Sequence, residues 1–302
     1  MTGAGSASLA FVVEDSFNTL PGTPSYYEFG RNVSVTELEL TNALQRSRAV
    51  GETESVESIA QRLEGAFAVE ADVSNDVHDQ VHNLVFNDGG TGFTPGAAPS
   101  GRVYAGLDYL SGTAERELQA CIPLEYQLIY EEDSLVRYSL TMAYADEALN
   151  TSITPSSVTT VSDGSSVPYH GTSLTIDSNA QGSYLQSATL SISGISRFRR
   201  GAQRAPVDAV VGPCNATLDT DAIITGTDEL ELAYGASSSA APQDSVGGVS
   251  AALDIATAGG TAVATYNLAN VTPNSHAWAD LVAAETDTTD SISWQVNGVS
   301  VA

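Results

Sequence analysis

The chain has 302 residues and no lysine, so its 11 basic residues are all arginine, and they face 37 Asp and Glu for a formal net charge of −26. A compact chain with this imbalance repels itself unless concentrated salt screens its charges, so the composition is typical of a protein that works in molar salt. Hydrophobic residues make up 42% of the chain and are regularly patterned, which argues against disorder, and the acidity argues against non-specific nucleic-acid binding, which needs a basic face.

The sequence lacks several signals of location and cofactor binding. No run of about 18 apolar residues occurs, and the N-terminal residues lack the basic and apolar stretches of a signal peptide. The two cysteines, Cys121 and Cys214, lie far apart without the spacing of a metal site. We therefore expect no membrane association, no disulfide framework, no bound metal and no cofactor.

The sequence predicts one clear helix. Ser74 is a suitable N-cap and Asp76 falls in the first turn. The segment 87–90, Asn-Asp-Gly-Gly, is expected to end the helix. The apolar side chains that recur at helical spacing are Val77, Val81, Leu84 and Val85.

An antiparallel hairpin is expected further along the chain. Apolar and polar residues alternate from Leu124 to Tyr130 and again from Val136 to Met142. This period of two is typical of strands with one buried face, and the polar segment 131–134 predicts the turn between them. Most other segments also have strand-like patterns, so the sequence predicts a mainly β fold.

The second half of the sequence repeats features of the first at an offset of about 150 residues. Each half has an alternating strand that leads to arginines (38–41 and 190–193) and a segment with a Leu-Asp pair (106–108 and 252–254). Each half then has a three-residue segment that ends in proline before a strand (121–123 and 271–273), and a final alternating strand (136–142 and 292–296). We predict a first β domain at 1–150, a Ser/Thr-rich linker at 151–166 and a second β domain at 167–302, related by duplication. The alternative is a pair of unrelated β domains.

The strongest catalytic pattern is His78-Asp79-Gln80-Val81-His82. Two histidines at i and i+4 bind zinc in metalloproteases with a His-Glu-x-x-His motif, but Asp79 replaces the glutamate that acts as general base. The apolar stripe places both histidines on a flank that we expect to be solvated. The sequence has no motif of a serine hydrolase, a phosphate-binding loop, a dinucleotide site or a calcium loop. We therefore expect no catalytic residue and no enzyme.

Six of the 11 arginines fall in two equivalent stretches, each of which leaves a strand for a glycine-containing loop. A guanidinium binds carboxylates through two hydrogen bonds and is weakly hydrated, which suits contacts with the acidic surface of another copy. The exposed edges expected of β domains also favour self-association. The alternative is that these arginines balance acidic groups within their own subunit. The candidate inter-ring or inter-subunit contact residues are Arg46, Arg48, Arg197, Arg199, Arg200 and Arg204.

The segment 11–27, Phe-Val-Val-Glu-Asp-Ser-Phe-Asn-Thr-Leu-Pro-Gly-Thr-Pro-Ser-Tyr-Tyr, resembles the opening of the tail tube (major tail) proteins of tailed double-stranded DNA viruses. The strand and arginine-bearing loop after Asn32, the helix end at 84–88 and the Cys-Ile-Pro segment at 121–123 support the resemblance. Together these segments look most like tail tube proteins of viruses that infect haloarchaea, which agrees with the salt argument.

This resemblance implies two tandem tail-tube-like β-sandwich or half-barrel domains, each with one flanking helix. In the family, copies join edge to edge into a ring whose inner sheet forms a β-barrel around a channel. Six single-domain copies make such a ring, so two domains per chain imply a homotrimer with pseudo-sixfold symmetry, the alternative being a hexamer. Rings stack into a tube through a projecting loop, and the arginine-bearing segments 43–58 and 195–210 fall where that loop is expected.

The resemblance also implies a location and partners. The chain is expected in the virion tail after assembly in the cytoplasm of a halophilic archaeal host, with other tail proteins at the tube ends. Viral DNA is expected to pass transiently through the lumen without specific binding. The alternative function is a receptor-binding or surface β module of a halophilic virus or cell, which fits the Ser/Thr-rich β composition.

Overall fold

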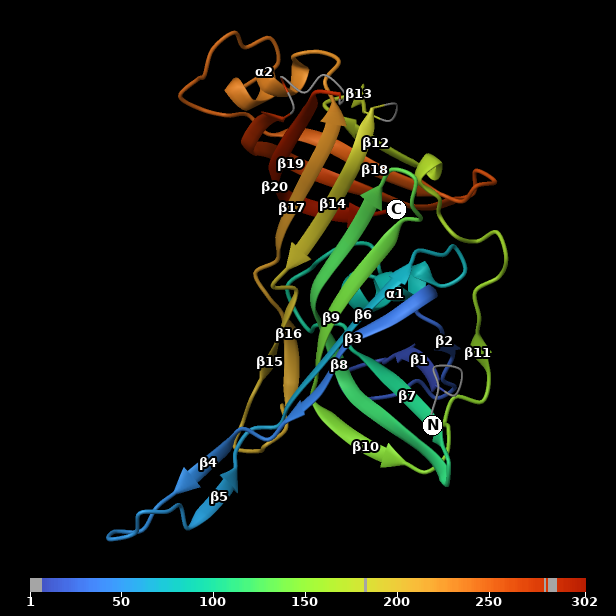
Figure 1. Cartoon of the computed structure of the whole chain (residues 1–302), viewed down its shortest axis with the longest axis vertical. Helices are drawn as coiled ribbons and strands as arrows, with labels where there is room; N and C mark the ends of the chain where they lie inside the picture. The colour runs from blue at the N-terminus through green and yellow to red at the C-terminus, as the bar shows by residue number, and fades with distance from the viewer. Residues whose placement is uncertain (1–6, 182–183, 280, 282–286) are drawn as a thin grey trace.

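The computed structural model describes residues 7–181, 184–279, 281 and 287–302, and the structural statements below concern this part of the chain. The described residues form 20 strands and two α-helices in an elongated molecule (Figure 1). The strands outnumber the helices, so the prediction of a mainly β fold is confirmed. Neither helix has the length and apolar character needed to cross a membrane.

The strands follow one another along the chain with few helical interruptions. The first elements are β1 (Ala7–Val13), β2 (Tyr26–Tyr27), β3 (Arg31–Thr41), β4 (Leu44–Ser47), β5 (Glu57–Ala60), β6 (Glu64–Asp72), α1 (His78–Val85), β7 (Gly101–Tyr109), β8 (Gly112–Glu131), β9 (Arg137–Tyr144) and β10 (Asp146–Asn150). The others are β11 (Val158–Thr159), a 3-10 helix (Tyr169–Gly171), β12 (Thr172–Ile176), β13 (Asn179–Ala180), β14 (Leu185–Ser193), β15 (Ser196–Arg199), β16 (Asp208–Val211), β17 (Asn215–Ile223), α2 (Asp228–Tyr234), β18 (Val249–Ala256), β19 (Ala262–Ala279) and β20 (Thr289–Val301).

Most of the strands form one large mixed sheet of 16 strands, in which β11 and β2 pair in parallel. Two small hairpins, β4–β5 and β15–β16, lie outside it. The described strands do not close the large sheet into a barrel. Ring formation and the division into domains at 1–150, 151–166 and 167–302 therefore stay predictions.

One antiparallel pairing order occurs twice within the large sheet. Strands β3, β6, β9, β8, β7 and β1 pair in that order, and we call them the first strand set. Strands β14, β17, β20, β19, β18 and β12 pair in the same order and make the second strand set. In each set a small hairpin lies between the first two strands of this pairing order, β3 and β6 or β14 and β17, and an α-helix follows the second of them.

Two prolines show which residues correspond between the sets. The register shifts directly after Pro123, where β8 pairs with β9, and directly after Pro273, where β19 pairs with β20. Proline has no N–H to donate to a ladder, so within a sheet it is tolerated at such bulges. The pairing on either side of the bulges aligns Leu38 with Leu190, as the sequence match predicted.

The same correspondence corrects one match made from the sequence. The Leu-Asp pairs at 106–108 and 252–254 lie in the corresponding strands β7 and β18. However, the ladders to β8 and β19 align Leu107 with Ile255, two residues beyond Leu253. The two-residue slip keeps the side chain on the same face of the strand, which is why an alternating pattern alone does not detect it.

Strand β8 joins the two strand sets into one sheet. Its first part pairs with β7 and β10, and its second part pairs with β9 and β14. Across the β8–β14 ladder, Leu128 faces Leu190 and Tyr126 faces Ile192, and all four side chains are fully buried. The two sets therefore share one apolar core.

The predicted hairpin is confirmed, and the predicted helix is shorter than expected. Strands β8 and β9 form the hairpin, but β8 begins at Gly112 because its first part pairs with β7. Helix α1 begins at His78, whose backbone N–H donates to the carbonyl of Ser74 at 3.0 Å. The side chain of Ser74 instead accepts from the backbone N–H of Asp76 at 3.3 Å.

The segment 151–166 is held against the first strand set. Its strand β11 pairs with β2, and both the backbone N–H and the hydroxyl of Ser162 donate to a carboxylate oxygen of Asp76 at 2.6 Å. A segment rich in Ser and Thr has many groups that bind backbone and carboxylate atoms locally. This connection is therefore attached to earlier parts of the chain, at β2 and at Asp76.

Leu190→Ala is expected to lower the free energy of unfolding by about 2–5 kcal/mol, because it opens a cavity in the core beside the β8–β14 ladder. Ser191→Ala, at the next residue on the opposite face, is the matched control and is expected to change stability by about 0.5 kcal/mol or less. Urea unfolding in molar salt measures both values. Equal small losses at the two positions would contradict the packing of β14 against β8.

Candidate self-assembly surface

Besides the short strands β10, β11 and β13, which each pair with one neighbour, two long strands of the large sheet have an open edge among the described residues. Strand β3 pairs with β6 along one edge, and its other edge is open. Strand β19 pairs with β20 along one edge, but β18 pairs only with residues 262–271 along the other, so residues 272–279 are open there. An open edge presents backbone N–H and C=O groups that can pair with another chain.

The open edge of β3 exposes side chains that its counterpart buries. In the second strand set, β14 lies beside β8, and Leu190 and Ile192 are fully buried. In the first set, Leu40, which corresponds to Ile192, is 42% exposed, and Val33 and Val35 are exposed as well. The difference follows from pairing, because β14 has a neighbouring strand on that side and β3 has none among the described residues.

The open edge of β19 shows the same contrast. Trp278 is 44% exposed, whereas the corresponding Leu128 of β8 is fully buried beside β14. Both open edges therefore carry apolar side chains at positions that the corresponding paired strands bury. Apolar surface of this kind at a sheet edge is typical of an interaction site.

The β4–β5 hairpin, which follows β3, extends away from the rest of the molecule (Figure 1). All residues of both strands are exposed, and Val50 and Val56 in the connecting loop are exposed too. Of the six candidate arginines, Arg46 lies in β4 and Arg48 directly follows it, both with exposed side chains.

The β15–β16 hairpin, which carries the other four candidate arginines, lies against the first strand set instead of projecting from it. Arg199 lies 3.6 Å from the carboxylate of Asp208 across the hairpin. Arg200 and Arg204 each donate to a backbone carbonyl at the base of the first hairpin, at 3.1 Å. Arg197 is exposed. Three of these arginines thus contact their own chain, and the assignment of all six to subunit contacts stays a prediction.

The two histidines of α1 are buried, so the expectation of a solvated flank is wrong. His78 and His82 are 1% and 5% exposed. The Nε2 atom of His78 lies 3.1 Å from the hydroxyls of Tyr126 and Tyr266, and Nε2 of His82 lies 2.7 Å from the Tyr266 hydroxyl. Tyr266 comes from β19, far along the chain, so no local pattern around the helix reveals that this side is covered.

Burial keeps both histidines neutral. Desolvation lowers the pKa of His82 from its ordinary value of 6.5 to about 4, and desolvation together with the neighbouring His82 lowers the pKa of His78 well below 6.5. Burial raises the pKa of Tyr126 and Tyr266, so both keep their hydroxyl protons. This network of neutral groups ties α1 to β8 and to β19. Among the described residues, no cluster of three or more His, Cys, Asp or Glu has the geometry to hold a metal ion.

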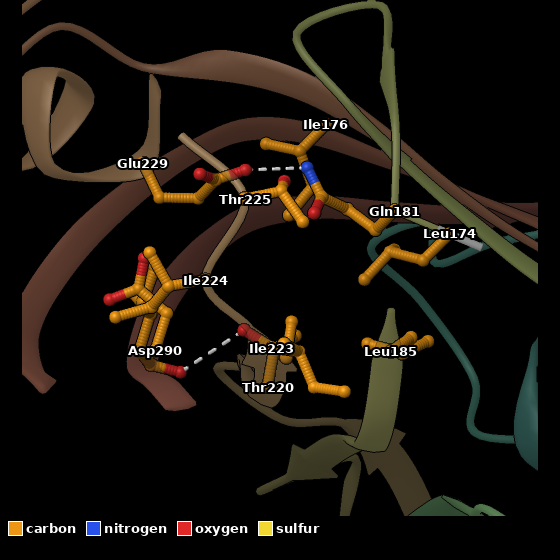
Figure 2. Close-up of a pocket in the computed structure, with 12 residues that line it drawn as sticks. Leu174, Ile176, Gln181, Leu185, Thr220, Ile223, Ile224, Thr225, Glu229 and Asp290 are labelled. Atoms are coloured by element: carbon orange, nitrogen blue, oxygen red, sulfur yellow. Dashed lines mark hydrogen bonds between the residues drawn. The ribbon is translucent and has the colours of Figure 1, made fainter. Parts of the chain in front are cut away.

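A small cavity lies in the second strand set, beside the segment that leads to α2 (Figure 2). Its volume is about 20 Å³, room for about one water molecule. Apolar side chains including Leu174, Leu185 and Ile223 line it, and at its rim Gln181 donates to Glu229 at 2.5 Å. A cavity of this size does not admit a substrate.

No protein-family model and no curated protein matches the sequence. Among solved structures, the chain is similar to a chain of the anti-feeding prophage (AFP) baseplate, determined by cryo-electron microscopy with 6-fold symmetrisation. The identity is 16%, the match covers 48% of this chain and 91% of that chain, and the TM-score is 0.35. A likeness of this size shows neither a common function nor a common assembly.

Lowering the pH is expected to destabilise the fold through His78 and His82. Because burial holds the pKa of both below 6.5, the unfolded chain takes up protons that the folded chain does not as the pH falls from 6.5 toward 4. The contribution of these histidines to stability is therefore complete above this range and is lost as the pH falls through it, by at most about 1.4 kcal/mol per pH unit for each histidine. Urea unfolding at a series of pH values measures the slope.

His82→Phe removes one of the two titrating groups and is expected to flatten this slope. His170→Asn, at an exposed histidine, is the matched control and is expected to leave the slope as in the unmodified chain. Equal slopes in all three proteins would contradict the assignment of acid sensitivity to the buried network.

Proposed function

We propose that the chain is a structural subunit of a viral tail tube, which joins copies of itself edge to edge into rings that stack into a hollow tube for DNA delivery. The observation that carries this proposal is the pair of open edges, β3 and residues 272–279 of β19, whose counterparts β14 and β8 pair with each other inside the chain. The pairing inside the chain thus serves as a template for pairing between copies.

The template supplies a register for the contact between copies. In the β8–β14 ladder, the paired residues include Leu128 with Leu190 and Tyr126 with Ile192. By correspondence, Leu38 of one copy faces Trp278 of the next, and Leu40 faces His276. This antiparallel ladder covers the exposed parts of Leu40 and Trp278 and gives the backbone groups of both edges hydrogen-bond partners.

The arrangement of the strands supports ring closure. Strands β3, β6, β9, β8, β14, β17, β20 and β19 form one continuous band with an open edge at each end. Pairing one end of the band with the other end in the next copy is a head-to-tail contact. Such contacts form a closed ring when the rotation returns to the start, and the band then has no open edge at either end. The proposed ring contains six strand sets, supplied by three chains with duplicated domains. A hexamer of chains is the alternative.

One face of this band suits a channel for DNA. The side chains that point away from the core include Glu125, Gln127, Ser139, Thr141, Thr189, Ser191, Thr217, Asp219, Ser291 and Ser293. Arg137 on this face is engaged by Glu70 at 3.3 Å. A polar surface without a basic cluster does not bind phosphates, so DNA can pass without sticking, while molar salt limits the repulsion to short range.

The proposal also assigns surfaces and a location. The projecting β4–β5 hairpin, with Arg46 and Arg48, contacts another copy in the tube, and Arg197 on the second hairpin is a further contact candidate. Other tail proteins meet the rings at the tube ends. The tube belongs to the virion of a virus that infects a halophilic archaeon, in whose cytoplasm it assembles, and the lysine-free acidic composition supports this host. No catalytic step is part of the proposal.

The unmodified chain in molar salt is expected to form rings or hollow tubes, visible by cryo-electron microscopy. Leu40→Asp places a carboxylate where the next copy would bury it, so assembly is expected to be lost. The free monomer is expected to keep its stability, because Leu40 is already 42% exposed in it. Particle images and urea unfolding measure the two effects separately.

Two matched variants sharpen this test. Ile192→Asp makes the corresponding change in the ladder inside the chain and is expected to prevent folding, since Ile192 is fully buried. Glu39→Gln, at the neighbouring residue of Leu40, is expected to leave assembly intact. Rings from Leu40→Asp as abundant as from the unmodified chain would refute the edge pairing. An unmodified chain that stays monomeric would refute the tube function and favour a binding module.

Reversing the charges of the projecting hairpin with Arg46→Glu and Arg48→Glu is expected to shorten or abolish tubes, because these side chains then repel the acidic surface of the neighbouring copy. Thermal unfolding is expected to be unchanged, since both side chains are exposed. Arg46→Lys together with Arg48→Lys, which keeps both positive charges in place, is the control. Tubes of normal length from the charge-reversed variant would contradict the role of the hairpin.

A further inference from the structure

The first part of the chain covers one end of the second strand set. The Tyr266 hydroxyl in β19 lies 2.7 Å from Nε2 of His82 in α1. Beyond α1, in the segment 86–100, the carbonyl of Thr91 accepts a hydrogen bond of 2.7 Å from the backbone N–H of Val301 at the end of β20. Val301 is 8% exposed as a result.

The corresponding end of the first strand set is uncovered. Tyr266 pairs with Val301, and at the corresponding positions Arg116 of β8 pairs with Leu149 of β10. Leu149 therefore stands where Val301 stands in the second set, yet it is 74% exposed. The same structural position is buried in one set and open in the other.

Further apolar side chains surround Leu149. Leu107 of β7 lies on the same face of the sheet, on the other side of β8, and is 39% exposed, whereas its counterpart Ile255 is 1% exposed. At the adjacent turn, Tyr109 and Leu110 are 46% and 98% exposed. These four residues, Leu107, Tyr109, Leu110 and Leu149, form what we call the open end of the first set.

The two helices differ in a complementary way. In α1 five of the eight residues are buried, whereas in α2 Leu232 is the buried residue among seven. Both helices contact the corresponding strand of their own set, α1 on β8 and α2 on β19. The difference in burial arises on another side of each helix, away from the strand of its own set. On this side β19 covers α1, whereas no described element covers α2. Most of the segment 236–248 after α2 is exposed as well.

We propose that α2 and the segment 236–248 of one copy cover the open end of the first set in the next copy, as α1 and the segment 86–100 cover the end at Val301 within the chain. The partner is a second copy of this chain. This contact rests on the proposed ring. When β19 of one copy pairs with β3 of the next copy, the first strand set of the next copy lies beside the second strand set of this copy, just as the second set lies beside the first set within one chain. It is a separate surface from the ladder itself.

Cross-linking between engineered cysteines tests the contact. Thr91 lies six residues after the end of α1, and Ala240 lies six residues after the end of α2. In a Cys214→Ser background, with the native Cys121 buried, the pair Leu149→Cys and Ala240→Cys is treated with a bis-maleimide after assembly in molar salt. A ladder of covalent dimers and trimers on a denaturing gel is expected, and it is expected to be lost in each single-cysteine variant.

Hydrogen–deuterium exchange of the unmodified chain provides a second measurement that does not depend on substitutions. Exchange in residues 146–150 and 236–248 is expected to slow when monomers assemble. Rings that form with no cross-linked ladder and with slowed exchange confined to β3 and β19 would overturn this contact while the tube function stands. An unmodified chain that never assembles would overturn both proposals.

Discussion

The antiparallel ladder between β8 and β14 is the interaction on which the rest of the structure depends. A buried strand edge must find partners for its backbone N–H and C=O groups, and these two strands supply them for each other. The ladder also buries leucine, isoleucine and tyrosine side chains from both strand sets, so that one apolar core continues from the first set into the second. Neither set is complete without the other along this edge.

The same ladder makes the remaining open edges informative. A single exposed leucine or tryptophan on a protein surface is ordinary and carries little meaning. Here the protein contains its own reference, because the matching positions in β14 and β8 show how such side chains are buried when a neighbouring strand is present. The exposure of Leu40 and Trp278 is therefore a difference between two equivalent positions. The same comparison between α1 and α2 leads to the second contact.

The sequence predicts the elements whose signals are local. The hairpin of β8 and β9 follows from alternation, and the matching strands β3 and β14 follow from similar short motifs. What the sequence does not predict comes from contacts between distant segments. His78 and His82 look solvated until Tyr266 covers them, and Arg200 and Arg204 look free until the second hairpin folds against the first set. The open edges are likewise invisible, because period-two patterning does not say which strand lies alongside.

The placement of carboxylates explains how so acidic a chain builds such ladders. Like charges that face each other across a ladder destabilise it. In the β8–β14 ladder, Glu125 faces Ser193 and Glu131 faces Ser187, so each carboxylate lies opposite a small uncharged residue.

The register proposed between copies obeys the same constraint. It sets Glu39 of β3 opposite Ala277 and Glu37 opposite Ala279, both in β19. No two carboxylates meet in the β8–β14 ladder or in the proposed register, so the repulsion that salt would have to screen between copies of charge −26 is the weaker, longer-range part. In the proposed contact, burial of apolar side chains and backbone pairing would then decide the association.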